Sequence, residues 1–287
     1  MNLQKTIAAP ESVIGPTVCS NEPCIMTLLP APEYTGVNFY RTDLHQKIPV
    51  KPKYVKNHSV TKWTALEKDG ARVEDTEHIL AALRGMEINN ITICLDSPGT
   101  PLMDGSALPF VEMIQRAGVV EQGAEVMLTE PVTASEAVWE DMVSFRTGEK
   151  RSKRSFLFAR PDKRLVVSYL LQYDGTPLPE QYAEYVVTPD VFATQIAPAR
   201  TFMTPWEIDK WGPAGSGLLS QYFCDIVPIL SDKRVFMERI PNEAATHKVL
   251  DMIGDLSILG SALVGGFMGM RSGHSLNSAM VRRLQRG

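Results

Sequence analysis

The chain has 287 residues, of which 44% are hydrophobic and 22% charged, and its 29 basic and 33 acidic side chains leave a net charge of -4. This near-average globular composition excludes disordered, collagen-like and coiled-coil proteins, and the slight acidic excess argues against a nucleic-acid-binding protein. At about 150 residues per domain, the length allows two domains with cores of their own.

The cysteines and the apolar segments favour a cytoplasmic protein. Four scattered cysteines are too few for a disulfide framework at this length, and none forms a Cys-x-x-Cys pair for a thiolate metal site. The start of the sequence lacks the continuous apolar core of a secretory signal. The longest weakly polar run, residues 256–270, contains four glycines and is too short to cross a bilayer, so we expect no stable membrane insertion.

In the first half of the chain, the pattern changes from short runs to helical periodicity. The predicted elements are strands and turns up to about residue 60, a helix over 76–86, a strand over 91–96 and a helix over 109–118. Thr76 is a favoured N-cap residue for the first helix, and Gly118 is a favoured residue just past the end of the second.

The same order of strands and then helices returns in the second half. The predicted elements are strands over 126–136, 142–147, 155–160 and 164–173, short helices over 189–196 and 206–211, a strand over 224–230, a helix over 242–259, a strand over 266–273 and a helix over 276–285. We therefore predict an α+β protein of two halves, residues 1–122 and 123–287.

The helix predicted over 242–259 carries three polar side chains on one side. His247, Asp251 and Asp255 are spaced four residues apart, whereas the rest of the segment is strongly apolar and predicts a buried helix. Buried carboxylates need a cation, a metal or several hydrogen bonds. A His–Asp pair at this spacing is able to bind a metal, but it is also typical of a structural hydrogen bond.

Two further histidines lie at predicted helix ends. His78 follows Glu77 in the first turn of its helix, where the helix dipole favours a neutral imidazole and an ionised carboxylate. Such a pair suits a metal ligand beside a general base, or else a helix-terminal charge beside a surface histidine. His274 follows a glycine between a strand and the last helix. Two histidines and one aspartate make a plausible catalytic zinc set, although spacing alone does not show that they meet.

The chain lacks the phosphate-binding loop, the Rossmann glycine pattern and the nucleophile elbow of serine hydrolases. Instead, its segments together resemble the UDP-3-O-acyl-N-acetylglucosamine deacetylase family, the zinc amidases of early lipid A synthesis. The resemblance covers most of the chain, and the order and separations of the segments also fit the family. It rests on TEHILAAL and NNITI (76–93), PLMDGSALPFVEMI (101–114), ARTF (199–202), HKVLDMIGDL (247–256) and SGHSLN (272–277).

The resemblance implies a metal site and an acid–base pair. The Zn²⁺ ligands would be His78, His247 and Asp251. Glu77 matches the general base, and His274 matches a second catalytic group that is thought to be protonated. The family's fold has two similar halves, each with helices packed on a sheet, and the active site lies between them.

The resemblance also implies the residues around that pair. Asp255 matches the acid that orients the catalytic histidine, and Thr201 matches a threonine that stabilises the oxyanion. Lys248 and Phe202 match residues on the substrate side. The expected substrate is an acylated UDP-sugar, the products are acetate and a free amine, and no obligate protein partner is expected. An apolar passage for the acyl chain is expected around residues 165–187.

Some segments depart from the family's usual pattern, among them VEDTEH before His78 and RIPNEAAT before His247. They leave two other functions open. One is a paralogous deacetylase of another N-acetylated sugar nucleotide, which a substrate panel would distinguish. The other is a catalytically silent relative that binds a sugar nucleotide, which zinc-dependent turnover would exclude. A purely structural protein would leave the acids of the apolar helix without a cause.

Overall fold

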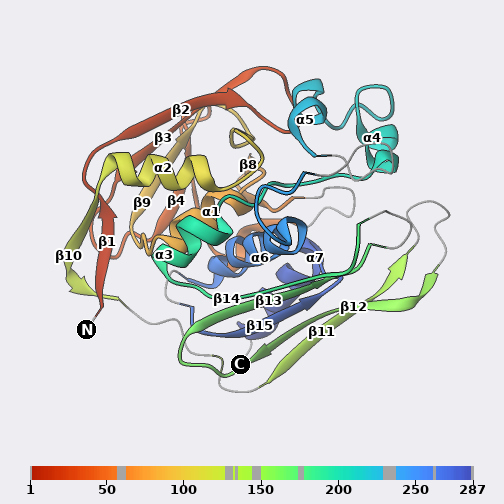
Figure 1. The fold of residues 1–287 in the computed structure, drawn as a ribbon. Helices are drawn as coiled ribbons and strands as arrows, with labels where there is room; N and C mark the ends of the chain where they lie inside the picture. Colours follow the sequence, from red (N-terminus) through yellow and green to blue (C-terminus); the bar gives the residue numbers. More distant parts are fainter. Residues whose placement is uncertain are drawn as a thin grey trace.

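The chain folds into two large sheets with helices between them and two smaller sheets beside them, as the computed structural model shows (Figure 1). The structure describes residues 2–56, 63–126, 132, 135–143, 150–173, 178–228, 237–260 and 263–285.

The first large sheet has five strands in the order β2-β3-β9-β4-β5. Neighbouring strands are antiparallel except β4 and β9, which are parallel. Alternate residues of β9 are buried, as expected for a strand with one face on the core. The strands are β2 (Glu11–Pro16), β3 (Pro23–Pro30), β4 (Val37–Arg41), β5 (Gln46–Pro49) and β9 (Ile91–Leu95).

The second large sheet repeats this topology. Its order is β11-β12-β15-β13-β14, and only β13 and β15 are parallel. In both sheets the last strand in sequence lies in the centre, between the second and the third. The strands are β11 (Glu136–Val143), β12 (Lys150–Arg160), β13 (Leu165–Leu171), β14 (Gln181–Val186) and β15 (Gly265–Met270). The prediction of two similar α+β halves is confirmed.

The main helices are also equivalent in the two halves. Helix α1 (Glu77–Gly85) precedes the central strand of the first sheet and α2 (Leu108–Ala117) follows it; α6 (Glu243–Leu256) and α7 (His274–Leu284) have the same places around β15. Helices α1 and α6 pack against each other between the sheets (Figure 1). The crossing of two equivalent helices is therefore the centre of the molecule.

Smaller elements surround this framework. Strands β1 (Leu3–Ile7) and β10 (Val119–Glu125) form an antiparallel pair, and β6 (Val55–Lys56), β7 (Ala65–Lys68) and β8 (Ala71–Val73) form a three-stranded sheet after the 3-10 helix η1 (Pro52–Tyr54). The predicted boundary between residues 122 and 123 falls within β10, and the division of the chain there stays a prediction.

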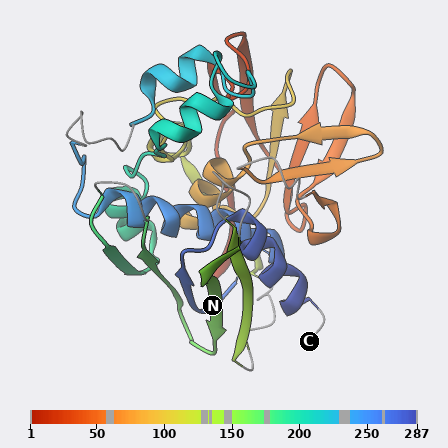
Figure 2. The ribbon, with the colours of Figure 1, turned by 90° about the vertical axis from the view of Figure 1, so that its right-hand side faces the viewer.

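A helical segment between β14 and α6 completes the fold. It contains α3 (Pro189–Val191), the π-helical turn η2 (Phe192–Ile196), α4 (Pro205–Trp211) and α5 (Gln221–Ile226), and η3 (Ser257–Leu259) extends α6. Figure 2 shows α4 and α5 in cyan on one side of the molecule and the strands of the three-stranded sheet in orange on the other.

Most predicted elements are confirmed to within a few residues, but one is wrong. Residues 224–230 were expected as a strand, whereas residues 221–226 form α5. The side chain of Ser220 accepts a hydrogen bond from the backbone N–H of Phe223 (3.1 Å) and so caps this helix. The strands predicted over 126–136 and 142–147 lie mostly outside the described residues. Strand β14 and the three-stranded sheet were not predicted.

All four cysteines are free. Within the described residues, no helix is both long enough and apolar enough to span a bilayer.

Candidate active site

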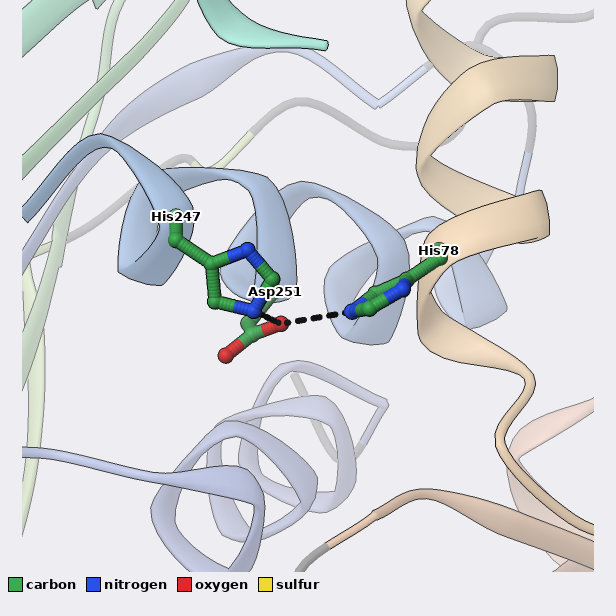
Figure 3. Close-up of side chains that lie close together, drawn as sticks. All are labelled: His78, His247 and Asp251. Carbon is green, nitrogen blue, oxygen red and sulfur yellow. Dashed lines mark ion pairs between the residues drawn. The ribbon is translucent and has the colours of Figure 1, made fainter. Parts of the chain in front are cut away.

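Three side chains from α1 and α6 converge where these helices cross (Figure 3). Oδ1 of Asp251 lies 3.2 Å from Nε2 of His247 and 3.6 Å from Nε2 of His78. The ligand atoms of the three residues lie within 4.8 Å of one another. The structure therefore brings together the three residues that the sequence suggested as metal ligands.

The protonation of these groups fits a metal ion. Nδ1 of His247 lies 3.0 Å from the carbonyl oxygen of Ala199, which only accepts, so Nδ1 donates to it and Nε2 is the ring nitrogen that faces Asp251. Burial lowers the pKa of His78 and favours its neutral form. Burial opposes ionisation of Asp251, but His247 and Lys248 outweigh it and hold the pKa of that carboxyl well below its usual range.

Oδ1 of Asp251 is the atom that most clearly requires a cation. It is buried and has no hydrogen-bond partner in the part of the chain that the structure describes. Lone pairs of two imidazoles and a carboxylate oxygen repel one another unless a positive charge lies between them. Two imidazole nitrogens and a carboxylate oxygen are a donor set typical of a divalent transition metal. This group could therefore bind a metal.

Glu77 lies beside this group at the start of α1. Its Oε2 accepts a hydrogen bond from the backbone N–H of Thr64 (3.0 Å), and its Oε1 lies 3.7 Å from Nε2 of His274. Burial raises the pKa of Glu77 to about 7; Asp255 and Asp251 add to this effect, whereas His274 opposes it. The side chain is therefore poised to exchange a proton near neutral pH.

His274, the first residue of α7, faces Glu77 on one side and Asp255 on the other. Its Nδ1 donates to Oδ2 of Asp255 (2.8 Å). Burial alone would lower the pKa of His274, but Asp255 and Glu77 outweigh it and raise the pKa to about 9. Asp255 also accepts hydrogen bonds from Oγ1 of Thr64 (2.5 Å) and Nδ2 of Asn277 (2.7 Å). The imidazolium form is therefore favoured at neutral pH.

Lys248, Thr201 and Phe202 line the same pocket as this group. Nζ of Lys248 donates to Oδ2 of Asp251 (2.8 Å) and lies 5.6 Å from the centre of the Phe202 ring. Although burial opposes the charged form, Asp251 keeps the pKa of Lys248 above its usual value. The backbone N–H of Thr201 donates to the carbonyl oxygen of Gly105 (2.7 Å), which fixes this turn against the first half of the molecule.

A cleft with about 720 Å³ of space, part of it open to solvent, connects these side chains. Eight of the nine predicted site residues line it, and the ninth, Asp255, lies behind His274. One wall of the cleft is apolar. The apolar wall consists of Val18, Trp63, Leu102, Met203, Leu219 and Phe223.

The apolar wall does not come from the stretch 165–187 that was expected to line the acyl passage. Residues 165–171 form β13, whose inward side chains belong to the core, and Tyr173 is the described residue of that stretch that lines the cleft. Much of the wall comes instead from the segment that contains α4 and α5.

Sequence patterns missed the residues that support the acid–base pair. Thr64 contacts both Glu77 and Asp255, and no motif marked it. Thr76 occupies the N-cap position as predicted, but its side chain does not cap the helix; its hydroxyl donates to the carbonyl oxygen of Thr64 (3.1 Å). Asp75 lines the cleft, and burial together with Glu77 raises the pKa of its carboxyl well above the usual range.

Comparisons with known proteins agree with this geometry. The family model for UDP-3-O-acyl N-acetylglycosamine deacetylase matches residues 4–286. A relative from Anaeromyxobacter sp. (strain Fw109-5) is 34% identical over 285 residues, which cover 98% of this chain and 88% of the relative. For relatives from Myxococcus xanthus (strain DK1622) and Coxiella burnetii (strain CbuK_Q154), the identity is also 34%, over 98% of this chain and 86% and 89% of the relatives. All three are named UDP-3-O-acyl-N-acetylglucosamine deacetylase.

Proposed function

The chain belongs to the UDP-3-O-acyl N-acetylglycosamine deacetylase family, and from this premise we propose how its cleft carries out the reaction. The protein is a hydrolase of lipid A biosynthesis that removes the N-acetyl group from an acylated UDP-sugar. Acetate and a free amine are the products. The observation that carries the assignment of the site is the buried Oδ1 of Asp251, which lies between two imidazoles without a hydrogen-bond partner in the described residues, next to an acid–base pair.

His78, His247 and Asp251 would hold the metal, and we propose zinc because two imidazoles and one carboxylate make a catalytic zinc set. When bound, zinc polarises an amide carbonyl and lowers the pKa of a water molecule. The hydrogen bond from His247 to Ala199 fixes the ring so that Nε2 points at the site.

Glu77 acts as the general base. It takes a proton from the water whose oxygen attacks the carbonyl carbon of the N-acetyl group. The hydrogen bond from Thr64 holds one carboxylate oxygen, and the other lies on the side of His274, 3.7 Å from its Nε2. The hydroxyl of Thr201, which also lines the cleft, would stabilise the negative charge that develops on the carbonyl oxygen.

His274 acts as the general acid. Its Nε2 gives a proton to the nitrogen of the amide as the C–N bond breaks, and the amine leaves. Asp255 keeps the imidazole in the charged form and in one orientation. Glu77 and His274 thus hold opposite protonation states before the reaction, one ready to accept and the other ready to donate.

The cleft also offers groups for the remaining parts of the substrate. Lys248 carries a positive charge beside Phe202 and would attract the phosphates of the nucleotide. The apolar wall would accept the acyl chain, because burial of methylene groups against apolar side chains is favourable. We also propose a cytoplasmic location, which four free cysteines support because a reducing compartment keeps thiols free.

Turnover of the purified protein tests this function. The zinc-loaded protein should release one acetate per molecule of UDP-3-O-acyl-N-acetylglucosamine. The rate should decrease in proportion as zinc is removed from the protein. A panel of other N-acetylated sugar nucleotides serves as the control for substrate choice. Faster turnover of a panel member without an acyl chain would contradict the proposed substrate, and no turnover by fully loaded protein would contradict catalysis.

A further inference from the structure

Trp63 lies where the polar and the apolar parts of the cleft meet. The next residue, Thr64, contacts both Glu77 and Asp255. Trp63 itself is only 6% exposed and packs in the cluster that forms the apolar wall, with Val18 and Leu102. The ring of Trp63 therefore belongs to the apolar wall, and the residue next to it in sequence contacts the catalytic groups.

The indole N–H of Trp63 has no acceptor among the residues that the structure describes. Among the buried polar atoms that lack a hydrogen-bond partner in the described part of the chain, two belong to residues that line the cleft: Oδ1 of Asp251 and Nε1 of Trp63. The first faces the proposed metal site. The second is a donor in an apolar wall, and a buried donor without an acceptor is unfavourable. Because an indole only donates, the group that would satisfy it must be an acceptor.

We infer that the N–H of Trp63 donates a hydrogen bond to the carbonyl oxygen of the substrate's 3-O-acyl ester. The inference rests on the proposed function, since it takes the acyl sugar as the ligand. In that substrate the ester group is the point where the polar sugar meets the aliphatic chain, as Trp63 is the point where polar and apolar walls meet. An ester carbonyl accepts hydrogen bonds and does not donate them. Trp63 is thus a specificity-determining residue that recognises the acyl linkage.

The experiment compares two ligands and two side chains. The ligands are the 3-O-acyl substrate and a 3-O-alkyl ether of the same chain length, which lacks the carbonyl oxygen. The proteins are the wild type and Trp63→Phe, which keeps an aromatic ring and lacks the N–H. Both kcat/KM and the binding constants from calorimetry are measured for each pair.

The wild type should prefer the ester to the ether by about tenfold, the scale of one net hydrogen bond. Trp63→Phe should lose most of this preference, with little change for the ether. Equal losses for both ligands would show that the ring only packs, and unchanged values for both would show that the N–H is not used. Either result overturns the inference. Trp139→Phe, at a 59% exposed position on β11, is the matched control and should keep the preference.

A second variant and the binding data decide the cases in which Trp63→Phe does not fold or the substrate is not turned over. If Trp63→Phe does not fold, Trp63→β-(3-benzothienyl)alanine keeps the bicyclic shape and removes only the N–H. If the wild type binds both ligands but turns over neither, the proposed function fails, and a preference for the ester that depends on Trp63 still supports the inference. Binding without any preference overturns it, whatever the turnover.

Discussion

Gly254 on α6 lies directly against the backbone of Glu77 on α1. A Cβ atom at Gly254 would stand 2.0 Å from the carbonyl oxygen of Glu77 and 2.8 Å from its carbonyl carbon. Only glycine allows this distance, because a rigid backbone group cannot move aside as a flexible side chain can. The contact sets how closely the two helices approach, and with it the separation of His78 from His247 and Asp251.

Replacement of Gly254 by alanine should therefore force α1 and α6 apart. We expect Gly254→Ala to lower the free energy of unfolding by about 1–3 kcal/mol, the usual cost of overpacking, and to weaken zinc binding. Thermal unfolding and a zinc titration measure the two effects. Gly15→Ala is the control, since its Cβ would meet its neighbours at 3.4 Å or more. Wild-type zinc affinity in Gly254→Ala would show that this contact does not set the metal site.

Glu77→Gln should separate the general base from the metal ligands. The substitution keeps the shape of the side chain and its contact with Thr64, but the amide cannot take a proton from water. We expect the zinc content to stay at the wild-type level while kcat falls by roughly a hundredfold or more. The exposed Glu112→Gln on α2 should change neither. Loss of zinc with normal activity per bound metal would instead identify Glu77 as a ligand.

The pH profile reports the opposite protonation states of Glu77 and His274. Activity requires Glu77 ionised and His274 protonated, and their pKa values lie at about 7 and about 9. Activity should therefore rise as pH increases through the first value and fall as it passes the second. Bound zinc favours the ionised carboxylate, so the acid limb of the loaded enzyme should lie below pH 7. A single alkaline rise without a decline would contradict the role of His274.

Asp255→Asn tests the cause of the high pKa of His274. The neutral amide no longer stabilises the imidazolium, so the alkaline limb should move to lower pH and kcat should fall. Asp209→Asn, an exposed position on α4, should leave the profile unchanged. An unmoved alkaline limb with a normal rate in Asp255→Asn would show that this acid only stabilises the fold.

Removal of the metal should destabilise the protein, because the buried lone pairs of the site then face one another. At a thousandfold excess of free metal over Kd, binding contributes about 4 kcal/mol, so chelation should lower Tm by roughly 10 °C. His247→Ala should bind no metal and show no shift on chelation. His45→Asn, at an exposed position with a left-handed backbone, should respond like the wild type. An equal shift in His247→Ala would mean that the chelator acts elsewhere.

The local sequence pattern was sufficient to predict the two helices that carry the metal site. The apolar periodicity of α1 and α6 predicted both helices, and the spacing of His247, Asp251 and Asp255 predicted their shared face. The supporting contacts could not be predicted in this way. Thr64 and Asp255 are 191 positions apart, so no local spacing relates them. The apolar residues of α5 suggested a strand, because a short apolar run does not distinguish a strand from a helix.

The two halves share one topology but contribute different residues to the reaction centre. The first half contributes Glu77 and one imidazole, and the second contributes the other imidazole, the carboxylate and the acid His274. Neither half alone contains all three metal ligands or both members of the acid–base pair. An ion bound by residues of both halves would link them. The fraction of protein that holds metal would therefore measure how much of it has the two halves packed against each other.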